Sequence, residues 1–214
     1  MTMKLHILPM SPHARKAMAL AEYLELPVDV IIPEFGTLQN DEAFLQKNPN
    51  AKVPVLEDGD HAEWESNSIL CYLAEKAGSD LWPQDAKQQH EVYRWLLWGA
   101  AHYSPAVLGV YFQKVIKPLL NMGELDHAVI QEKIGFTERF AKVLDDRLAR
   151  QAFVVGDSLT VADFSIGAIT ETTKLTQIDL SAYENIQAWL LRLRALKGWS
   201  EITPARETSL PLAA

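Results

Sequence analysis

The feature that most constrains the fold is a change of hydrophobic pattern near residue 80. Before it, short apolar runs alternate with helical segments, which is typical of strand–helix–strand units whose strands run parallel. After residue 86 no strand pattern is found, and the chain has helical patterns throughout. The sequence therefore predicts an α/β domain over residues 1–80, a linker over 81–86 and an all-helical domain over 87–214.

Local signals place the individual elements within this frame. A serine before a proline marks a helix start, and Gly59 within Asp58-Gly59-Asp60 marks a hairpin because glycine adopts positive φ freely. Thr160 and Asp163 have capping-box spacing. Strands are expected at 5–8, 28–32, 53–57 and 62–65, and helices at 11–24, 42–46, 66–78, 87–122 with a kink at Pro105, 126–150, 160–174 and 183–196.

Composition narrows the function classes. The formal net charge of -8 argues against nucleic acid, because phosphate binding needs a basic face. The single cysteine, Cys71, cannot form an internal disulfide, fits a reducing compartment and is expected to be inert core. No apolar run approaches a membrane span and no signal peptide is recognised, so we expect a cytoplasmic protein. No residues have metal-ligand spacing, so no metal is expected.

The turn Ser11-Pro12 allows two interpretations. A serine before the first helical residue can simply cap the helix. It can also donate a hydrogen bond to an anion, helped by the unpaired N–H groups and partial positive charge of a helix start. Local sequence alone favours the plain cap.

Two further pairs of residues are ambiguous in the same way. Pro54 lies inside an apolar run, where a trans edge proline is the ordinary case, whereas a cis Val53-Pro54 bond would offer the Val53 backbone to an extended peptide. Ser66 is expected to be the N-cap of its helix beside a solvated Glu65. Alternatively the pair could bind a zwitterion, with Glu65 on the ammonium and Ser66 on the carboxylate.

Aromatic residues follow the long helix that is expected after the linker. Trp95, Trp98 and His102 should share one face, which is more often core than a ligand pocket. His102 is expected to be a hydrogen-bonded core residue rather than a base. A kinked helix could equally line an apolar substrate pocket with Trp98 and His102.

Three blocks in this order resemble the soluble glutathione transferase family over nearly the whole chain. They are FLQKNPNAKVPVLEDG from Phe44, ESNSILCYL from Glu65 and SLTVAD from Ser158. The resemblance implies a thioredoxin-like N-terminal domain followed by an all-helical C-terminal domain, paired as a homodimer. Its partners would be glutathione as co-substrate and small hydrophobic electrophiles.

The resemblance also implies roles for individual residues. Val53, before a cis Pro54, would pair with the cysteinyl backbone of glutathione, and Glu65 and Ser66 would hold its γ-glutamyl end. Gln39 and Lys52 lie where the family often contacts the glycyl end. No tyrosine precedes Tyr23 and no cysteine occurs at the Ser11 turn, so the chain resembles the serine-using, theta-like bacterial branch, with Ser11 as the catalytic residue.

The chemistry that this implies is activation of a thiol. A free thiol has a pKa of about 8.5, and a hydroxyl donor and a helix N-terminus both favour the thiolate. The thiolate would attack an apolar electrophile. Glutathione-dependent peroxidase, dehalogenase or isomerase activity would use the same site, and a non-catalytic binding or regulatory protein of the same fold is the alternative outside the enzymes.

Overall fold

The computed structural model describes residues 2–199, which form two compact units. The first comprises residues 2–82 with 196–199, and the second comprises residues 83–195. The boundary after Trp82 falls within the segment that we expected to be a linker. Residues 196–199, which we expected in the helical domain, belong to the first unit, and the rest of that expected domain, 200–214, lies outside the described residues.

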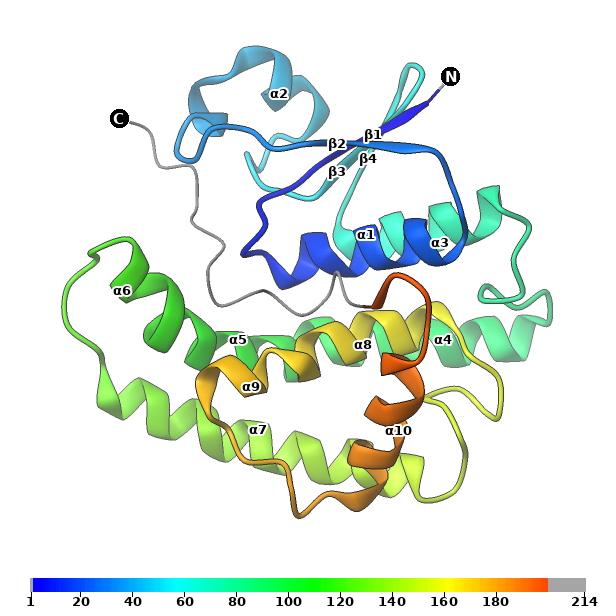
Figure 1. Cartoon of the computed structure of the whole chain (residues 1–214), viewed down its shortest axis with the longest axis vertical. Coiled ribbons are helices and arrows are strands. Elements are labelled where there is room, and N and C mark those ends of the chain that lie inside the picture. Colours follow the sequence, from blue (N-terminus) through cyan, green and yellow to red (C-terminus); the bar gives the residue numbers. More distant parts are fainter. Residues whose placement is uncertain (1, 200–214) are drawn as a thin grey trace. The chain divides into compact units, whose positions relative to one another are not determined.

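The first unit contains a mixed sheet of four strands in the order β2-β1-β3-β4 (Figure 1). β1 and β2 are parallel, with Leu5 opposite Val30, while β3 joins β1 and β4 in antiparallel ladders. This is the predicted strand–helix–strand unit with an added hairpin. The bounds of the strands are β1 Met3–His6, β2 Val28–Ile31, β3 Val55–Asp58 and β4 His61–Trp64.

The first strand ends two residues earlier than predicted. Ile7 still donates its N–H to the carbonyl of Ile31, but the carbonyl of Leu8 already accepts from Ser11 across a turn that contains Pro9. The apolar run thus continues past the ladder into the turn that starts the first helix.

Helices cover both faces of this sheet (Figure 1). α1 and α3 pack against each other on one face, and the η1–α2 segment lies on the other. Phe44 and Leu38 of that segment form a buried cluster with Val55 of β3. The bounds are α1 Pro12–Tyr23, η1 Leu38–Asn40, α2 Glu42–Lys47 and α3 Ser66–Lys76.

Two glycines stand where the turns require positive φ, and Gly59 was predicted to do so. Gly59 has φ +66 in the β3–β4 hairpin, and Gly78 has φ +60 just after α3. The N–H of Gly78 donates to the carbonyl of Glu75, and Ser79 donates to Ala74, so the last carbonyls of α3 are paired.

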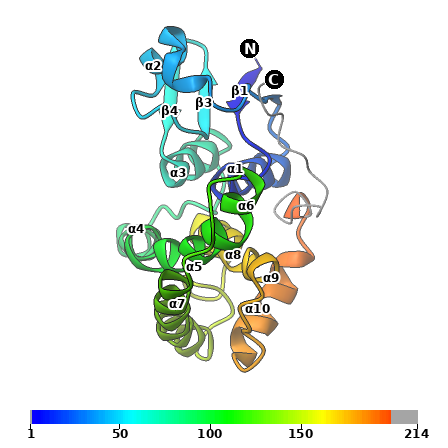
Figure 2. The same ribbon diagram turned by 90° about the vertical axis from the view of Figure 1, so that its left-hand side faces the viewer.

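The described part of the second unit contains only helices (Figure 2). α7 packs on α5, and α8 is buried along its whole length against the surrounding helices. The bounds are α4 Ala86–Trp98, α5 Ser104–Tyr111, α6 Lys117–Leu119, α7 His127–Leu148, α8 Val161–Glu171, α9 Thr173–Thr176 and α10 Glu184–Arg194, with π-helical segments η2 Gly99–Tyr103 and η3 Phe112–Ile116.

Both π-helical segments end directly before a proline-containing turn. η2 precedes Pro105 and η3 precedes Pro118. A proline lacks the N–H for the i→i−4 bond and crowds the carbonyl of that residue, so a wider turn before it relieves the clash. At Pro105, where we predicted a kink, the structure has a π-helical segment, and a second one precedes Pro118.

The predicted capping box at the start of α8 is also present. Asp163, which is fully buried, accepts hydrogen bonds from the N–H of Thr160 at 2.9 Å and of Val154 at 2.8 Å, and from the Trp189 indole at 2.9 Å. Burial raises the pKa of Asp163, and these hydrogen bonds oppose that rise. The carboxylate thus joins the helix start, the preceding loop and α10.

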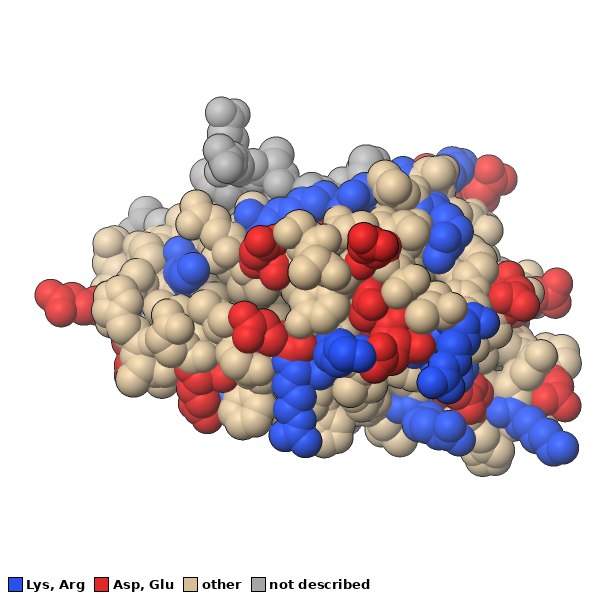
Figure 3. Space-filling view, turned by 90° about the horizontal axis from the view of Figure 1, so that it is seen from below, with Lys and Arg blue, Asp and Glu red and all other residues tan. Residues whose placement is uncertain are grey.

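The surface carries charges of both signs. Over the face of Figure 3, lysine and arginine side chains are interspersed with aspartate and glutamate, and no continuous basic stripe is seen. Within residues 2–199, no helix has the length and apolar character needed to cross a bilayer. The same residues contain no group of three or more His, Cys, Asp and Glu side chains that could hold a metal ion.

Candidate functional site

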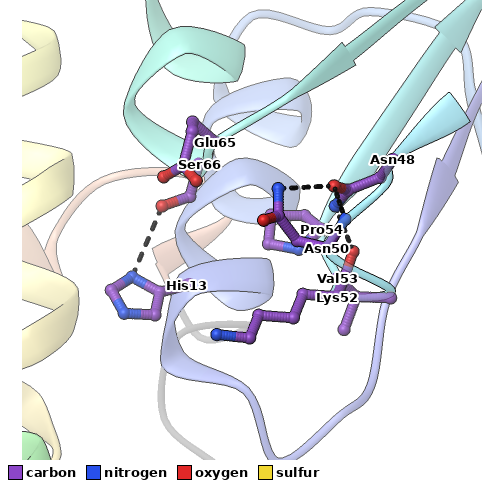
Figure 4. A pocket seen from close by; sticks show the side chains of 8 residues that line it. All are labelled: His13, Asn48, Asn50, Lys52, Val53, Pro54, Glu65 and Ser66. Atoms are coloured by element: carbon purple, nitrogen blue, oxygen red, sulfur yellow. Dashed lines mark hydrogen bonds between the residues drawn. The ribbon is translucent and has the colours of Figure 1, made fainter. Parts of the chain in front are cut away.

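The first unit contains a surface cavity of about 250 Å³ at the start of α3 (Figure 4). His13 and Ser66 lie on one side of it, and the loop before β3 forms the other. Its lining residues are His13, Asn48, Asn50, Lys52, Val53, Pro54, Glu65 and Ser66. The cavity therefore brings together two of the sequence blocks that are far apart in the chain.

Five of the six residues expected to bind glutathione line this cavity: Lys52, Val53, Pro54, Glu65 and Ser66. The sixth, Gln39, is exposed on η1 and is not among the lining residues. Neither is Ser11, which lies two residues before His13. His13, Asn48 and Asn50 are lining residues that we did not select from the sequence.

Ser11 is the N-cap of α1, as its sequence context indicated. Its Oγ accepts a hydrogen bond of 3.3 Å from the N–H of Ala14. A hydroxyl has one donor hydrogen and two acceptor lone pairs, so accepting from Ala14 leaves the hydrogen available. Capping and donation to a bound anion are therefore compatible in the same side chain.

The Val53-Pro54 peptide bond is cis, as the family resemblance implied. The loop before it is held by Asn48, which is buried. The Asn48 amide donates to the carbonyl of Lys52 at 2.7 Å, and its Oδ1 accepts from the backbone N–H and the side-chain amide of Asn50. The side chain of Asn48 thus fixes the backbone that presents Val53 to the cavity.

The prediction that Ser66 is the N-cap of α3 was wrong by one position. Glu65 occupies the cap position with φ +67 and makes no side-chain cap bond, while Ser66 is the first helical residue. β4 ends at Trp64, so Glu65 alone makes the turn from strand to helix. As a result the Ser66 hydroxyl does not cap its own helix.

The Ser66 hydroxyl instead contacts His13. Ser66 Oγ lies 3.4 Å from His13 Nδ1, and this links the first turn of α3 to the first turn of α1 (Figure 4). Burial, followed by the nearby Lys16 ammonium, lowers the pKa of His13 to about 3. The imidazole is therefore neutral at physiological pH.

A second contact joins the same two helices one turn deeper. Lys16 is buried and donates from Nζ to Oδ1 of Asn67 at 2.6 Å. Burial lowers the pKa of Lys16 to about 7, against the opposite influence of the Glu65 carboxylate. Two hydrogen-bonded pairs thus fix the helix starts at the cavity in relation to each other.

Cys71 lies on α3 and is half-buried, so it is not the fully buried core residue that we expected. Burial, followed by Glu75, raises the pKa of its thiol to about 12. A thiol with that pKa carries almost no thiolate at neutral pH, so it is a poor nucleophile. This supports the expectation that Cys71 is chemically inert.

The aromatic residues of the second unit form a cluster with α7. The Trp98 ring lies 5.0 Å from Trp95, 5.4 Å from Tyr103 and 6.2 Å from Phe140. Trp95 and Tyr103 are buried and Trp98 is half-buried, as expected for a packed face. This packing supports the core interpretation of this face, and the pocket-lining role of Trp98 stays a prediction.

His102 is exposed, so the expectation that it is a core residue was wrong. It belongs to η2, where the wider π turn rotates successive side chains away from the positions that a regular α-helix gives them. Its ring still lies 5.6 Å from that of Phe140 on α7. A role for His102 in an electrophile pocket also stays a prediction.

Comparisons with known proteins find matches for both the N-terminal and the C-terminal part of the chain. Residues 1–75 match the family model described as the glutathione S-transferase N-terminal domain, and residues 107–197 match that of the C-terminal domain. The glutathione S-transferase GstB of Escherichia coli is 31% identical over 86% of this chain and 88% of its own length. A probable glutathione S-transferase of Oryza sativa, GSTF2, is 29% identical over 90% of this chain and 92% of its own length.

Solved structures agree with these matches. The theta-class glutathione S-transferase of Xanthomonas axonopodis pv. citri, with glutathione bound, is 27% identical and has a TM-score of 0.87. The alignment covers 97% of this chain and 99% of that one.

Proposed function

This chain belongs to the glutathione S-transferase family, and from that premise we propose that it activates glutathione at the cavity beside α3. The observation that carries the proposal is the convergence on one cavity of the cis Val53-Pro54 bond and the Glu65-Ser66 pair. A peptide that carries a zwitterion at one end and a thiol near its middle fits this combination of groups.

Glu65 and Ser66 bind the γ-glutamyl end in this proposal. The Glu65 carboxylate pairs with the ammonium, and the Ser66 hydroxyl and the N-terminus of α3 receive the carboxylate. Ser66 is the first residue of α3, so its N–H is one of the donors that a helix start leaves without an intrahelical partner. Both charges of the ligand terminus are then matched.

The rest of the peptide extends along the loop before β3. Val53 pairs through its backbone with the cysteinyl residue, and the exposed Lys52 ammonium receives the glycyl carboxylate. Gln39 is proposed as an outlying contact to the glycyl end, although it does not line the cavity.

Ser11 activates the thiol. Its hydroxyl hydrogen donates to the sulfur, and the N-terminus of α1 adds a partial positive charge. Each unit by which the thiol pKa falls corresponds to about 1.4 kcal/mol in favour of the thiolate. The thiolate then attacks an apolar electrophile, and the serine-using, theta-like mode of activation is part of this proposal.

The thiolate site also serves peroxide reduction, dehalogenation or isomerisation, since each begins with the same nucleophile. Trp98 and His102 are proposed to line the electrophile pocket that would select among these substrates. The protein is proposed to act in the cytoplasm, where glutathione is reduced.

A homodimer is proposed, with α4 at its interface. Tyr93 and Leu97 lie four residues apart on one face of α4 and are 46% and 67% exposed. Ala100 and Ala101 extend this exposed face with small side chains. Two large apolar side chains beside small ones form a surface that a second copy of the chain could bury.

The test is a calorimetric titration with glutathione, followed by turnover assays. The panel should contain an activated aryl halide, an organic hydroperoxide and a small disulfide, each with and without glutathione. Binding and aryl transfer support the main proposal, whereas binding with peroxide turnover alone selects the alternative chemistry. Absence of binding at millimolar glutathione would overturn the proposal and favour a non-enzymatic role.

A further inference from the structure

His13 and Ser66 form a hydrogen-bonding contact, and the chemistry of the cavity determines which of the two side chains donates. Both side chains line the cavity, and Ser66 Oγ and His13 Nδ1 lie 3.4 Å apart. His13 is at the second position of α1 and Ser66 at the first position of α3, so the contact joins two helix starts. Either group could donate, because a neutral imidazole carries its hydrogen on one nitrogen or the other.

The hydroxyl of Ser66 has a single hydrogen. A carboxylate only accepts hydrogen bonds, so a hydroxyl that binds a carboxylate must direct its hydrogen at it. The Ser66 oxygen can then only accept from the imidazole, which requires a hydrogen on His13 Nδ1. If Nδ1 carried no hydrogen, the Ser66 hydroxyl would donate its hydrogen to the ring. It could then not donate to the carboxylate of the ligand.

The surroundings keep the imidazole neutral in this arrangement. The Lys16 ammonium acts on His13, and the Glu65 carboxylate acts on Lys16. The half-buried imidazole is partly removed from water and Lys16 lies one helical turn away on α1, so a second positive charge at His13 is disfavoured.

We propose that His13 is a positioning residue for glutathione: its Nδ1–H donates to Ser66 Oγ and thereby directs the Ser66 hydroxyl hydrogen at the γ-glutamyl carboxylate. This inference rests on the proposed function, since it specifies how the same cavity orients one of its binding groups. It assigns His13 a role in affinity for glutathione, while thiol chemistry remains with Ser11.

Two substitutions separate donation from packing. In His13→Asn the side-chain amide can place an N–H near the position of Nδ1, whereas His13→Leu keeps bulk and removes the donor. We expect the dissociation constant for glutathione to rise about tenfold in His13→Leu and to stay within about twofold of the wild type in His13→Asn. Turnover at saturating glutathione should be nearly unchanged in both. His61→Asn, at an exposed position of β4, is the matched control.

A ligand that lacks the γ-glutamyl α-carboxylate completes the test. Against 4-aminobutanoyl-cysteinyl-glycine the wild type and His13→Leu should bind equally, because the group that Ser66 serves is gone. In ¹⁵N NMR spectra, glutathione should fix His13 as the Nδ1–H tautomer.

The outcomes distinguish a failure of the proposed function from a failure of the role assigned to His13. A wild type that does not bind glutathione removes the proposed function. A wild type that binds, with His13→Asn and His13→Leu equally impaired or with an Nε2–H tautomer in the complex, overturns the role of His13 alone. Thermal unfolding of each variant identifies any that fail to fold, and in that case the tautomer of the wild type decides.

Discussion

The Lys16 ammonium on α1 donates a 2.6 Å hydrogen bond to Oδ1 of Asn67 on α3, the residue after Ser66. The lysine lies inside the packed pair of helices, with its side chain almost wholly removed from water. Burying a charge costs free energy that its hydrogen bonds and opposite charges only offset. The contact therefore joins α1 and α3 beside the cavity through a group whose charge depends on pH.

Lys16 should make stability rise with pH. Burial lowers its pKa in the folded protein to about 7, whereas the unfolded chain keeps the ordinary value near 10.5. Below pH 7 both states are protonated and the cost of burying the charge is present in full. As the pH rises above 7 only the folded state loses its proton, so that cost is relieved.

The measurement is urea unfolding of the wild type and Lys16→Met from pH 6 to 9. The free energy of unfolding of the wild type, relative to Lys16→Met, should rise by roughly 2 kcal/mol between pH 7 and 9. Lys87→Met, which removes an ammonium from α4, controls for loss of charge. A constant difference across this range would show that Lys16 is neutral or charged throughout.

Ser11→Ala should separate catalysis from binding. Turnover should fall sharply because the thiol loses its hydroxyl donor, while the affinity for glutathione should stay close to the wild type. Loss of the cap bond to Ala14 should also cost about 1 kcal/mol of stability.

Asp126→Ala is the matched control for the Ser11 variant. Asp126 caps α7 through the N–H of Val129, and its loss should lower stability by a similar amount without affecting turnover. If turnover at saturating glutathione were unchanged in Ser11→Ala, thiol activation would have to be assigned to the backbone N–H groups of α1.

The sequence predicts the architecture well where local chemistry decides it. The period of the apolar residues identified the strands and helices, and Gly59 marked a turn that needs positive φ. The Thr160–Asp163 spacing identified the capping box, because both partners lie within one helical turn. Each of these signals is carried by residues close together in the chain.

The errors arise where backbone geometry departs from the regular pattern. Ser66 is a good N-cap chemically, but β4 passes into α3 through Glu65 alone, with φ +67, which no preference of glutamate predicts. His102 would share a face with Trp98 in a regular α-helix, but the π turn of η2 changes the phase. The His13–Ser66 contact joins residues 53 positions apart, so it depends on helix packing that no local motif encodes.

Glu65 should show a conflict between stability and binding. A non-glycine residue at φ +67 is strained by roughly 1–3 kcal/mol, and glycine relieves that strain. We therefore expect Glu65→Gly to be more stable than Glu65→Ala by about 1 kcal/mol, although glycine usually destabilises. Both variants lose the carboxylate, so both should be retained more weakly on immobilised glutathione.

Glu63 supplies the opposite control for this pair. It lies on β4 with ordinary strand geometry, so Glu63→Gly should be less stable than Glu63→Ala. Chemical unfolding of the four variants measures both differences. Equal stability of the two Glu65 variants would mean that the turn relaxes without glycine, and full retention on glutathione would place the ammonium elsewhere.

Leu97 tests the proposed dimer surface. A glutamate at the centre of the apolar face of α4 would have to be buried without a partner, which an interface tolerates poorly. We expect Leu97→Glu to shift the sedimentation coefficient from dimer to monomer at micromolar concentration. Leu191→Glu is a matched control, because Leu191 on α10 is exposed to nearly the same degree, 65% against 67%. Dissociation by Leu191→Glu and not by Leu97→Glu would move the interface from α4 to α10.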